Sequence, residues 1–124
     1  MTLLKARTDL DEEPGANGTE IMNAIKYVRP GKGFVPNFPL MEKSDVNGEN
    51  EIPLYTYLKS RCPPPVTAFW SRDCRLAYQP KRGSDIRWNF EKFLINRHGI
   101  PVIRYSQTVQ PDDIKQDIYN LLAG

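Results

Sequence analysis

The C-terminal third of the chain contains the pattern that constrains its fold most, two apolar stretches joined by a short polar turn. Apolar side chains alternate along the first stretch, at Ile86, Trp88, Phe90, Phe93 and Ile95, with one irregularity at Glu91-Lys92. A period of two predicts a strand with one buried face. Asn96–Gly99 has the residue types of a turn, and Ile100–Tyr105 predicts a second strand. The two strands therefore form a β-hairpin.

Three other segments have the apolar spacing of helices. The first begins at a capping box of Asn17 and Glu20, and the others begin at Pro53 and Pro111. Inward-facing side chains are expected at Ile21, Ile25 and Val28 in the first helix, at Leu54, Tyr57 and Leu58 in the second, and at Ile114, Ile118, Leu121 and Leu122 in the third. The second helix ends before Pro63, which prevents its continuation.

Residues 38–46 predict a third strand, and Pro39 places its start at the edge of a sheet because proline cannot donate to a ladder. Asp45–Gly48 supplies the turn after it. Residues 66–84 have no clean period and predict a long loop, which in a compact domain is usually functional. The order of elements predicts an α/β fold. Three strands among three helices are few, so a unit upstream of them is expected to be missing.

Composition and charge argue against several classes of function. The 17 basic and 15 acidic residues are scattered and give a net charge of +2, which predicts no nucleic-acid surface, and Lys81-Arg82 is read as a solvated loop. No apolar run approaches the ~20 residues of a membrane span, and residues 1–9 are too polar for a signal peptide. One histidine and two cysteines are too few for structural zinc. Cys62 and Cys74 are either a disulfide or two unrelated thiols.

Three segments resemble the glutathione peroxidase family and follow one another in the family's order. Lys26–Phe34 resembles its Lys-Tyr-Val-Arg-Pro-Gly-Gly-Gly-Phe segment, with Lys32 in place of the middle glycine. Asp45–Gly48 resembles its strand-ending turn. Asp85–Leu94 resembles its Trp-Asn-Phe-Glu-Lys-Phe signature, and the whole resemblance extends from about Glu13 to Leu122.

The resemblance implies a partial thioredoxin-like fold, in which a C-terminal β-hairpin and an edge strand have flanking helices and the first βαβ unit is missing. On this basis residues 13–124 are the C-terminal region of a glutathione peroxidase, and residues 1–12 are a divergent N-terminal segment. The chain is accordingly expected to be N-terminally truncated relative to the family.

Members of the family reduce hydroperoxides to alcohols with a selenocysteine or cysteine, which two glutathione molecules then restore. The resemblance implies that Trp88 and Asn89 are supporting donors of that site, because an indole N–H and an amide suit an anionic nucleophile. Without the resemblance, Trp88 reads as a core residue and Asn89 as the partner of a neighbouring turn. Neither the nucleophile segment nor the glutamine segment of the family occurs in these residues. The chain is therefore expected to be inactive alone, and it leaves open whether the site uses selenium or sulfur.

Two arginines are expected to bind the carboxylates of glutathione as co-substrate, with no other cofactor. Arg29 matches an arginine implicated in glutathione binding in tetrameric members, and its alternative role is a charge at a helix C-terminus. Arg104 lies on the second hairpin strand, next to the family position that carries such a residue. Those members often have Arg-Arg where this chain has Gln107-Thr108, so a different thiol reductant stays open.

The loop at residues 63–84 resembles an insertion of oligomeric members, and Tyr55–Pro64 is most similar to the secreted, plasma-type branch. Asn17-Gly18-Thr19 is a glycosylation sequon, which matters only after export. These features imply a secreted full-length parent that forms homo-oligomers and binds glutathione and hydroperoxides, with neither nucleic acid nor membrane as a partner. The alternative function is a non-catalytic interaction subunit that docks on full-length homologues through residues 63–84. A third alternative is a fragment that does not fold alone.

Overall fold

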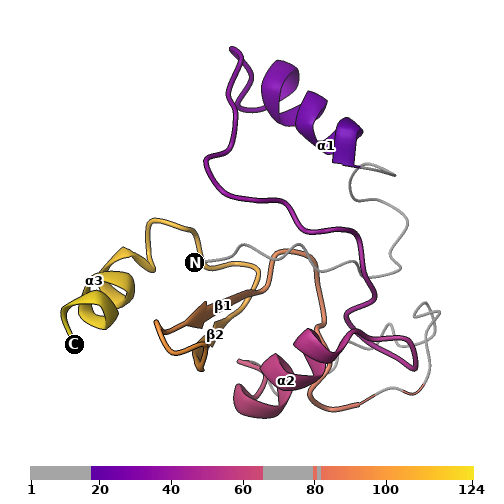
Figure 1. Ribbon diagram of the computed structural model, residues 1–124, viewed down its shortest axis with the longest axis vertical. Helices are drawn as coiled ribbons and strands as arrows, with labels where there is room; N and C mark the ends of the chain where they lie inside the picture. Colours follow the sequence, from indigo (N-terminus) through magenta and orange to yellow (C-terminus); the bar gives the residue numbers. More distant parts are fainter. Residues whose placement is uncertain (1–17, 66–79, 81) are drawn as a thin grey trace.

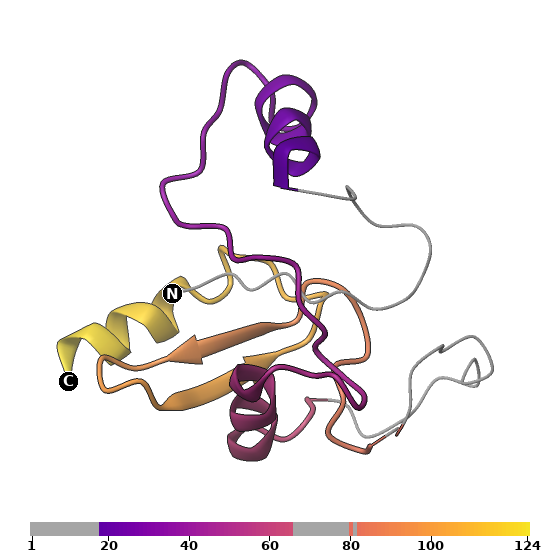
Figure 2. The same ribbon diagram turned by 45° about the vertical axis from the view of Figure 1, so that its right-hand side comes forward.

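The computed structural model describes residues 18–65, 80 and 82–124 (Figure 1). Its elements are, in chain order, helix α1 (Gly18–Asn23), the π-helix η1 (Ala24–Val28), helix α2 (Pro53–Arg61), strands β1 (Lys92–Ile95) and β2 (Pro101–Tyr105), and helix α3 (Lys115–Ala123). The hairpin lies at the centre, with α2 on one side of it and α3 at its end (Figures 1 and 2). None of the helices in the described ranges is long and apolar enough to cross a membrane.

The predicted hairpin is confirmed, although its first strand is shorter than expected. Strands β1 and β2 pair antiparallel, with Phe93 opposite Arg104. The Asn96 side chain closes the turn, because its Oδ1 accepts hydrogen bonds from the backbone N–H groups of His98 at 2.9 Å and Ile100 at 3.0 Å. Gly99 has a φ of +79°, which glycine adopts without strain. Residues 86–91, which the alternation assigned to the same strand, instead form an irregular segment with a turn before β1.

Helix α2 begins at Pro53 and ends before Pro63, as predicted, but it buries a different face. The buried side chains are Tyr55, Leu58 and Lys59, whereas Tyr57 is 37% exposed. Positions 55, 58, 59 and 62 have the i, i+3, i+4, i+7 spacing of one helical face. The apolar spacing did not indicate this face, because one of its buried residues is Lys59.

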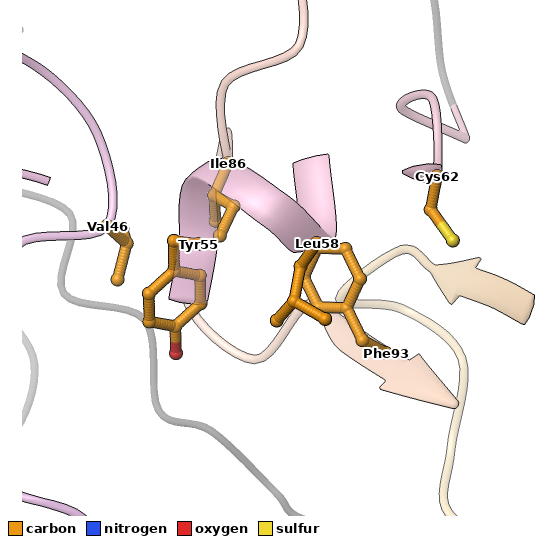
Figure 3. Packing of buried hydrophobic residues seen from close by; sticks show 6 residues of the cluster. All are labelled: Val46, Tyr55, Leu58, Cys62, Ile86 and Phe93. Atoms are coloured by element: carbon orange, nitrogen blue, oxygen red, sulfur yellow. The ribbon is translucent and has the colours of Figure 1, made fainter. Parts of the chain in front are cut away.

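One apolar cluster connects α2 to the hairpin and to the segment that precedes it (Figure 3). Its members come from four separate segments and are Val46, Tyr55, Leu58, Cys62, Ile86 and Phe93. Leu58 and Ile86 are each 1% exposed. Because burial of such side chains contributes about 1.5–3 kcal/mol each, this cluster fixes the position of α2 relative to residues 86–95.

Helices α1 and η1 lie apart from the hairpin in both views and contain no buried residue (Figures 1 and 2). Of the predicted inward positions, Ile21 and Ile25 are partly buried, and Val28 is 78% exposed. The described residues therefore provide little for this helix face to pack against. Asn17, the first residue of the predicted capping box, lies outside the described residues.

The predicted strand at residues 38–46 is wrong. Only Asp45 makes a single bridge, and residues 39–44 have no regular secondary structure. The sheet of the described residues contains β1 and β2 alone. A strand requires a neighbour for its backbone N–H and C=O groups, and no described strand lies beside this segment. The turn at residues 47–50 is present, with Gly48 at a φ of +85°.

The C-terminal helix begins later than Pro111, because residues 111–114 form a turn and α3 starts at Lys115. Ile114 is 1% exposed, whereas Leu122, which was expected to face inward, is 66% exposed. The Tyr105 hydroxyl donates a hydrogen bond to Asp117 Oδ2 at 2.7 Å and connects α3 to β2.

Candidate functional site

The predicted donors lie in a turn, residues 88–90, immediately before the hairpin. The Trp88 side chain is 44% exposed, whereas Asn89 is 4% exposed. The interpretation of Trp88 as an ordinary core residue is therefore wrong, since almost half of its surface faces solvent. Phe90 follows with a φ of +66°, which is costly for a bulky side chain. Backbone strain of this kind concentrates at functional sites, because surrounding contacts must maintain it.

The upstream end of the turn is attached to the distant Asn47 side chain. The backbone N–H of Ile86 donates to Asn47 Oδ1 at 2.8 Å, and Asn47 Nδ2 donates to the Ile86 carbonyl at 2.7 Å. Both groups are buried. One amide side chain thus satisfies the backbone donor and acceptor of a residue two positions before Trp88.

A buried lysine organises this upstream attachment. Lys59 is 5% exposed, and its Nζ donates to the Val46 carbonyl at 2.9 Å and to Asn47 Oδ1 at 3.2 Å. It also forms ion pairs with Glu51 and, at 3.3 Å, with Asp85 Oδ1. Burial of an ammonium group is tolerated only where opposite charges and acceptors surround it, and Lys59 has both.

The groups around Glu51 favour its ionised form. Burial raises the pKa of Glu51, but hydrogen bonds from Lys59 and Thr56 and the charges of Lys59 and Arg82 outweigh that effect. The net result is a pKa below the ordinary value of 4.5. Asp85 Oδ2 accepts a hydrogen bond from the Arg82 backbone at 2.7 Å, which orders the chain just before the turn.

The downstream end of the turn is held by a second buried ion pair. Glu91 Oε1 accepts the backbone N–H of Arg87 at 2.8 Å, so this carboxylate closes the segment across the turn. Glu91 Oε2 accepts a hydrogen bond from Arg104 Nε at 2.7 Å and forms an ion pair with Arg104 Nη2, also at 2.7 Å. The remaining Arg104 donors bind the backbone carbonyls of Ser84 at 2.9 Å, Asp85 at 2.9 Å and Cys62 at 3.5 Å.

The structure separates the two arginines that were predicted to bind substrate. Arg104 is 6% exposed and its guanidinium is fully occupied by acceptors of the fold, which makes it a structural residue in this arrangement. Arg29 is exposed at the end of η1, on the part of the chain that lies apart from the hairpin (Figure 1). The two residues do not form one rim, and a contact of either with glutathione stays a prediction.

Cys62 is a free, buried thiol in the core cluster. Burial raises the pKa of this thiol, and the nearby Arg104 charge opposes the effect only in part. A reactive cysteine requires an accessible thiolate, so Cys62 does not have the properties of a peroxide-reducing nucleophile. Cys74 lies outside the described residues, as do residues 66–79 and 81 of the loop on which the alternative docking function depends. Within the described ranges, no group of three or more His, Cys, Asp or Glu side chains is arranged to hold a metal ion.

The sequence interpretation missed the residues that hold the turn. They are the polar side chains Asn47, Glu51, Lys59, Asp85 and Glu91. One signal was present, because Lys59 falls on the face that Tyr55 and Leu58 define, and a charged residue at a core position requires partners. The identity of those partners depends on contacts across as many as 39 residues.

Comparison with known proteins supports the resemblance of these segments. The family model of glutathione peroxidase matches residues 9–59. Glutathione peroxidase 3 from Sapajus apella and that from Mus musculus are each 50% identical over 111 residues, which cover 90% of this chain and 48% of the relative. The epididymal secretory glutathione peroxidase from Mus musculus is 49% identical over 113 residues, covering 90% of this chain and 50% of the relative. These relatives agree with the predicted similarity to the plasma-type branch.

Solved structures show the same relationship. The crystal structure of T. cruzi GPX1 has a TM-score of 0.52 at 35% identity, over 76% of this chain and 52% of that chain. Trgpx in apo form has a TM-score of 0.54 at 28% identity, over 90% of this chain and 75% of that chain. The fold class is accordingly α/β and thioredoxin-like, as predicted.

The match extends over nearly all of this chain but only part of its relatives. The chain spans about half the length of the curated relatives it matches. The boundary between residues 12 and 13 stays a prediction. The identity, the family model and the solved structures agree on one assignment: the chain belongs to the glutathione peroxidase family.

Proposed function

We propose that this chain supplies the donor side of a peroxidase site that reduces hydroperoxides to alcohols with a thiol as reductant. The observation that supports the proposal is the Trp88–Asn89 turn, a strained segment anchored at both ends by buried polar groups. The Trp88 side chain is 44% exposed, so part of the indole faces solvent. An N–H donor held in this way is available to an anion that approaches the turn.

In the proposed reaction, a selenolate or thiolate attacks one oxygen of the hydroperoxide. The O–O bond breaks, the alkoxide takes a proton and leaves as an alcohol, and the nucleophile becomes a selenenic or sulfenic acid. One thiol then displaces water to form a mixed selenosulfide or disulfide. A second thiol attacks the sulfur of the first, which releases the reduced nucleophile and a disulfide of the two thiols. Trp88 and Asn89 act before the first step, because hydrogen bonds to the charged form lower the pKa of the nucleophile and keep it ionised.

The 124 residues do not contain the family's nucleophile segment. We therefore do not expect the chain alone to reduce hydroperoxides. Glutathione is the reductant we propose, with Arg29 as a contact for one of its carboxylates, and assembly into homo-oligomers is part of the same proposal. The proposed nucleophile is either a selenocysteine or a cysteine.

The first experiment measures hydroperoxide reduction by the purified chain with glutathione. We expect the same rate for the chain and for its Cys62→Ser/Cys74→Ser variant, because the thiol in the core is buried. A rate for the parent well above that of the double variant would show that one of these cysteines is a nucleophile, and would refute the assignment of the chain as the donor side alone.

The second experiment supplies a nucleophile. A chimera joins the part of Mus musculus glutathione peroxidase 3 that lies outside the match, where we expect the family's nucleophile segment, to residues 13–124 of this chain. Trp88→Phe should lower the rate of the peroxide-dependent step on the order of 100-fold, as expected when one fixed donor to a reacting anion is removed. Tyr119→Phe is the matched control, since it removes one polar hydrogen from an aromatic residue that is 65% exposed on α3. Equal rates for both variants would reject the role of Trp88.

A further inference from the structure

We propose that Asn47, held in one orientation by Lys59, is a positioning residue for the Trp88–Asn89 turn. The inference rests on the proposed function, because it concerns the placement of the two donors. Asn47 has no place in the chemistry itself and acts only through the backbone of Ile86.

A double hydrogen bond joins the Asn47 side chain to the backbone of Ile86. Its two distances, 2.8 and 2.7 Å, are short for amide groups, and both partners are buried. Ile86 is also in the core cluster, so its side chain and its backbone are fixed at once. Only Arg87 separates this fixed residue from Trp88.

Lys59 determines the orientation of the Asn47 amide. An ammonium group can only donate, so Lys59 Nζ at 3.2 Å requires the oxygen of the Asn47 amide on its side. The same oxygen accepts from the Ile86 N–H, which leaves Nδ2 to donate to the Ile86 carbonyl. Lys59 thus selects the one amide orientation that satisfies both backbone groups of Ile86.

Lys59 is itself held in place by several buried contacts. Its ammonium is held between the carboxylates of Glu51 and Asp85, and it donates to the Val46 carbonyl, next to Asn47 in the chain. Helix α2 carries Lys59 and also carries the core side chains Tyr55 and Leu58. Lys59 and Asn47 therefore fix the position of the turn relative to α2, which has more buried side chains than the other helices of the described structure.

The downstream contacts cannot replace this attachment. Glu91 ties the turn to the Arg87 backbone within the same segment, and Arg104 holds Ser84 and Asp85 from β2. Arg104 also reaches the end of α2 through the Cys62 carbonyl at 3.5 Å, but neither Glu91 nor Arg104 binds the backbone groups of Ile86, which only Asn47 holds among the described side chains. Loss of Asn47 should therefore leave the turn folded but displaced relative to the core, and a displacement of about 1 Å is enough to impair a reacting geometry.

The test uses the fluorescence of Trp88 in the full 124-residue chain. The chain has two tryptophans, so Trp70→Phe leaves Trp88 as the single reporter. In this background we expect Asn47→Ala and Lys59→Met each to shift the Trp88 emission to longer wavelength. Their acrylamide quenching constants should rise by at most about twofold, since Trp88 is already 44% exposed.

The matched control is Asn96→Ala, which also removes two hydrogen bonds between an asparagine side chain and backbone groups, but in the hairpin turn. Urea unfolding of all variants sets conditions of equal stability for the comparison. An unchanged Trp88 signal in Asn47→Ala, or an equal change in Asn96→Ala, would overturn the proposal. The double variant Asn47→Ala/Lys59→Met should match the larger single effect, and additive effects would show that Lys59 does not act through Asn47.

The fluorescence result does not depend on peroxidase activity, so the two proposals fail separately. If Trp88→Phe has no effect in the chimera while Asn47→Ala still changes the Trp88 signal, the proposed function is rejected and the positioning role stands. If the chimera is active and sensitive to Trp88→Phe but Asn47→Ala changes neither signal nor rate, the positioning role is rejected alone.

Discussion

Replacement of Arg104 by methionine tests whether this arginine is structural, as the geometry indicates, or a residue that binds substrate. Methionine keeps much of the side-chain volume and removes all five N–H donors. In the structure these donors are divided between the carboxylate of Glu91 and the backbone carbonyls of Ser84, Asp85 and Cys62. The substitution therefore leaves a buried carboxylate without its cation.

The expected cost follows from the burial of the pair. The side chains of Arg104 and Glu91 are 1% and 3% exposed, so solvent can do little to compensate either charge. Removal of one partner from such a pair costs about 3–5 kcal/mol, because the other charge remains buried. A domain of this kind has a total stability of about 5–15 kcal/mol, so Arg104→Met should remove a large part of it.

Urea unfolding followed by far-UV circular dichroism measures this cost, and a double-mutant cycle assigns it to the pair. Glu91→Gln in the Arg104→Met background removes the unpaired charge and should recover about 0.5–3 kcal/mol. Arg97→Met is the control, since Arg97 donates to the Leu122 carbonyl at 3.0 Å from an exposed position. Its loss should cost less than about 1 kcal/mol.

Two outcomes would refute the structural role of Arg104. One is a cost for Arg104→Met no greater than that for Arg97→Met. The other is the absence of coupling to Glu91 in the double-mutant cycle. Either outcome, together with weaker glutathione binding, would restore the interpretation of Arg104 as a carboxylate-binding residue.

Three further predictions concern single residues. Lys32 has a φ of +55°, so Lys32→Gly should relieve about 1–2 kcal/mol of left-handed strain against about 0.5–1 kcal/mol of glycine entropy and raise the urea midpoint; a lower midpoint would contradict this. Burial alone would raise the pKa of Glu51, but its hydrogen bonds and cations hold it below 4.5, so its contribution to stability is complete above that pH and is lost as the pH falls through the lower folded value. Glu51→Gln should accordingly flatten the acid side of the stability–pH curve, and parallel curves for parent and variant would exclude this. In a Cys74→Ser chain, the buried Cys62 should react with a disulfide reagent only as fast as the structure opens, and rapid labelling in native buffer would contradict its burial.

The parts of the fold that were predicted correctly are those that local chemistry determines. The hairpin turn needs only the Asn96 side chain and the positive φ of Gly99, both within four residues. The start of α2 at Pro53 and its end before Pro63 likewise follow from the fixed φ and the missing N–H of proline. Residues of this type carry their structural preference with them.

The incorrect parts depend on neighbours that are distant in sequence. Alternation at residues 86–90 predicted a strand, but Asn47 occupies the backbone hydrogen bonds of Ile86 and the chain turns at Trp88. Residues 38–46 had the composition of a strand and lacked a described partner to pair with. In both cases the missing information was which group lies opposite the backbone.

The candidate site shows the same division. The sequence identified Trp88 and Asn89 through a resemblance, and it identified none of the contacts that place them. Those contacts join residues 47 and 86, 59 and 85, and 91 and 104, pairs that no local pattern relates. Arg104 was predicted to bind substrate from its charge and its place next to a family position. That prediction overlooked Glu91, the buried carboxylate just before β1 with which Arg104 pairs.

The segments that carried the resemblance have a common physical basis in this structure. Asn47 belongs to the Asp-Val-Asn-Gly segment and Glu91 to the Trp-Asn-Phe-Glu-Lys-Phe segment, and these two side chains hold opposite ends of one turn. Much of what makes the segments recognisable is therefore the support of Trp88 and Asn89, not the chemistry itself. A chain can retain such support whether or not a nucleophile accompanies it, because the anchors consist of contacts within residues 47–104. The segments that mark the family and the nucleophile are therefore separable, and the chimera tests whether the support of Trp88 and Asn89 contributes to turnover once a nucleophile is supplied.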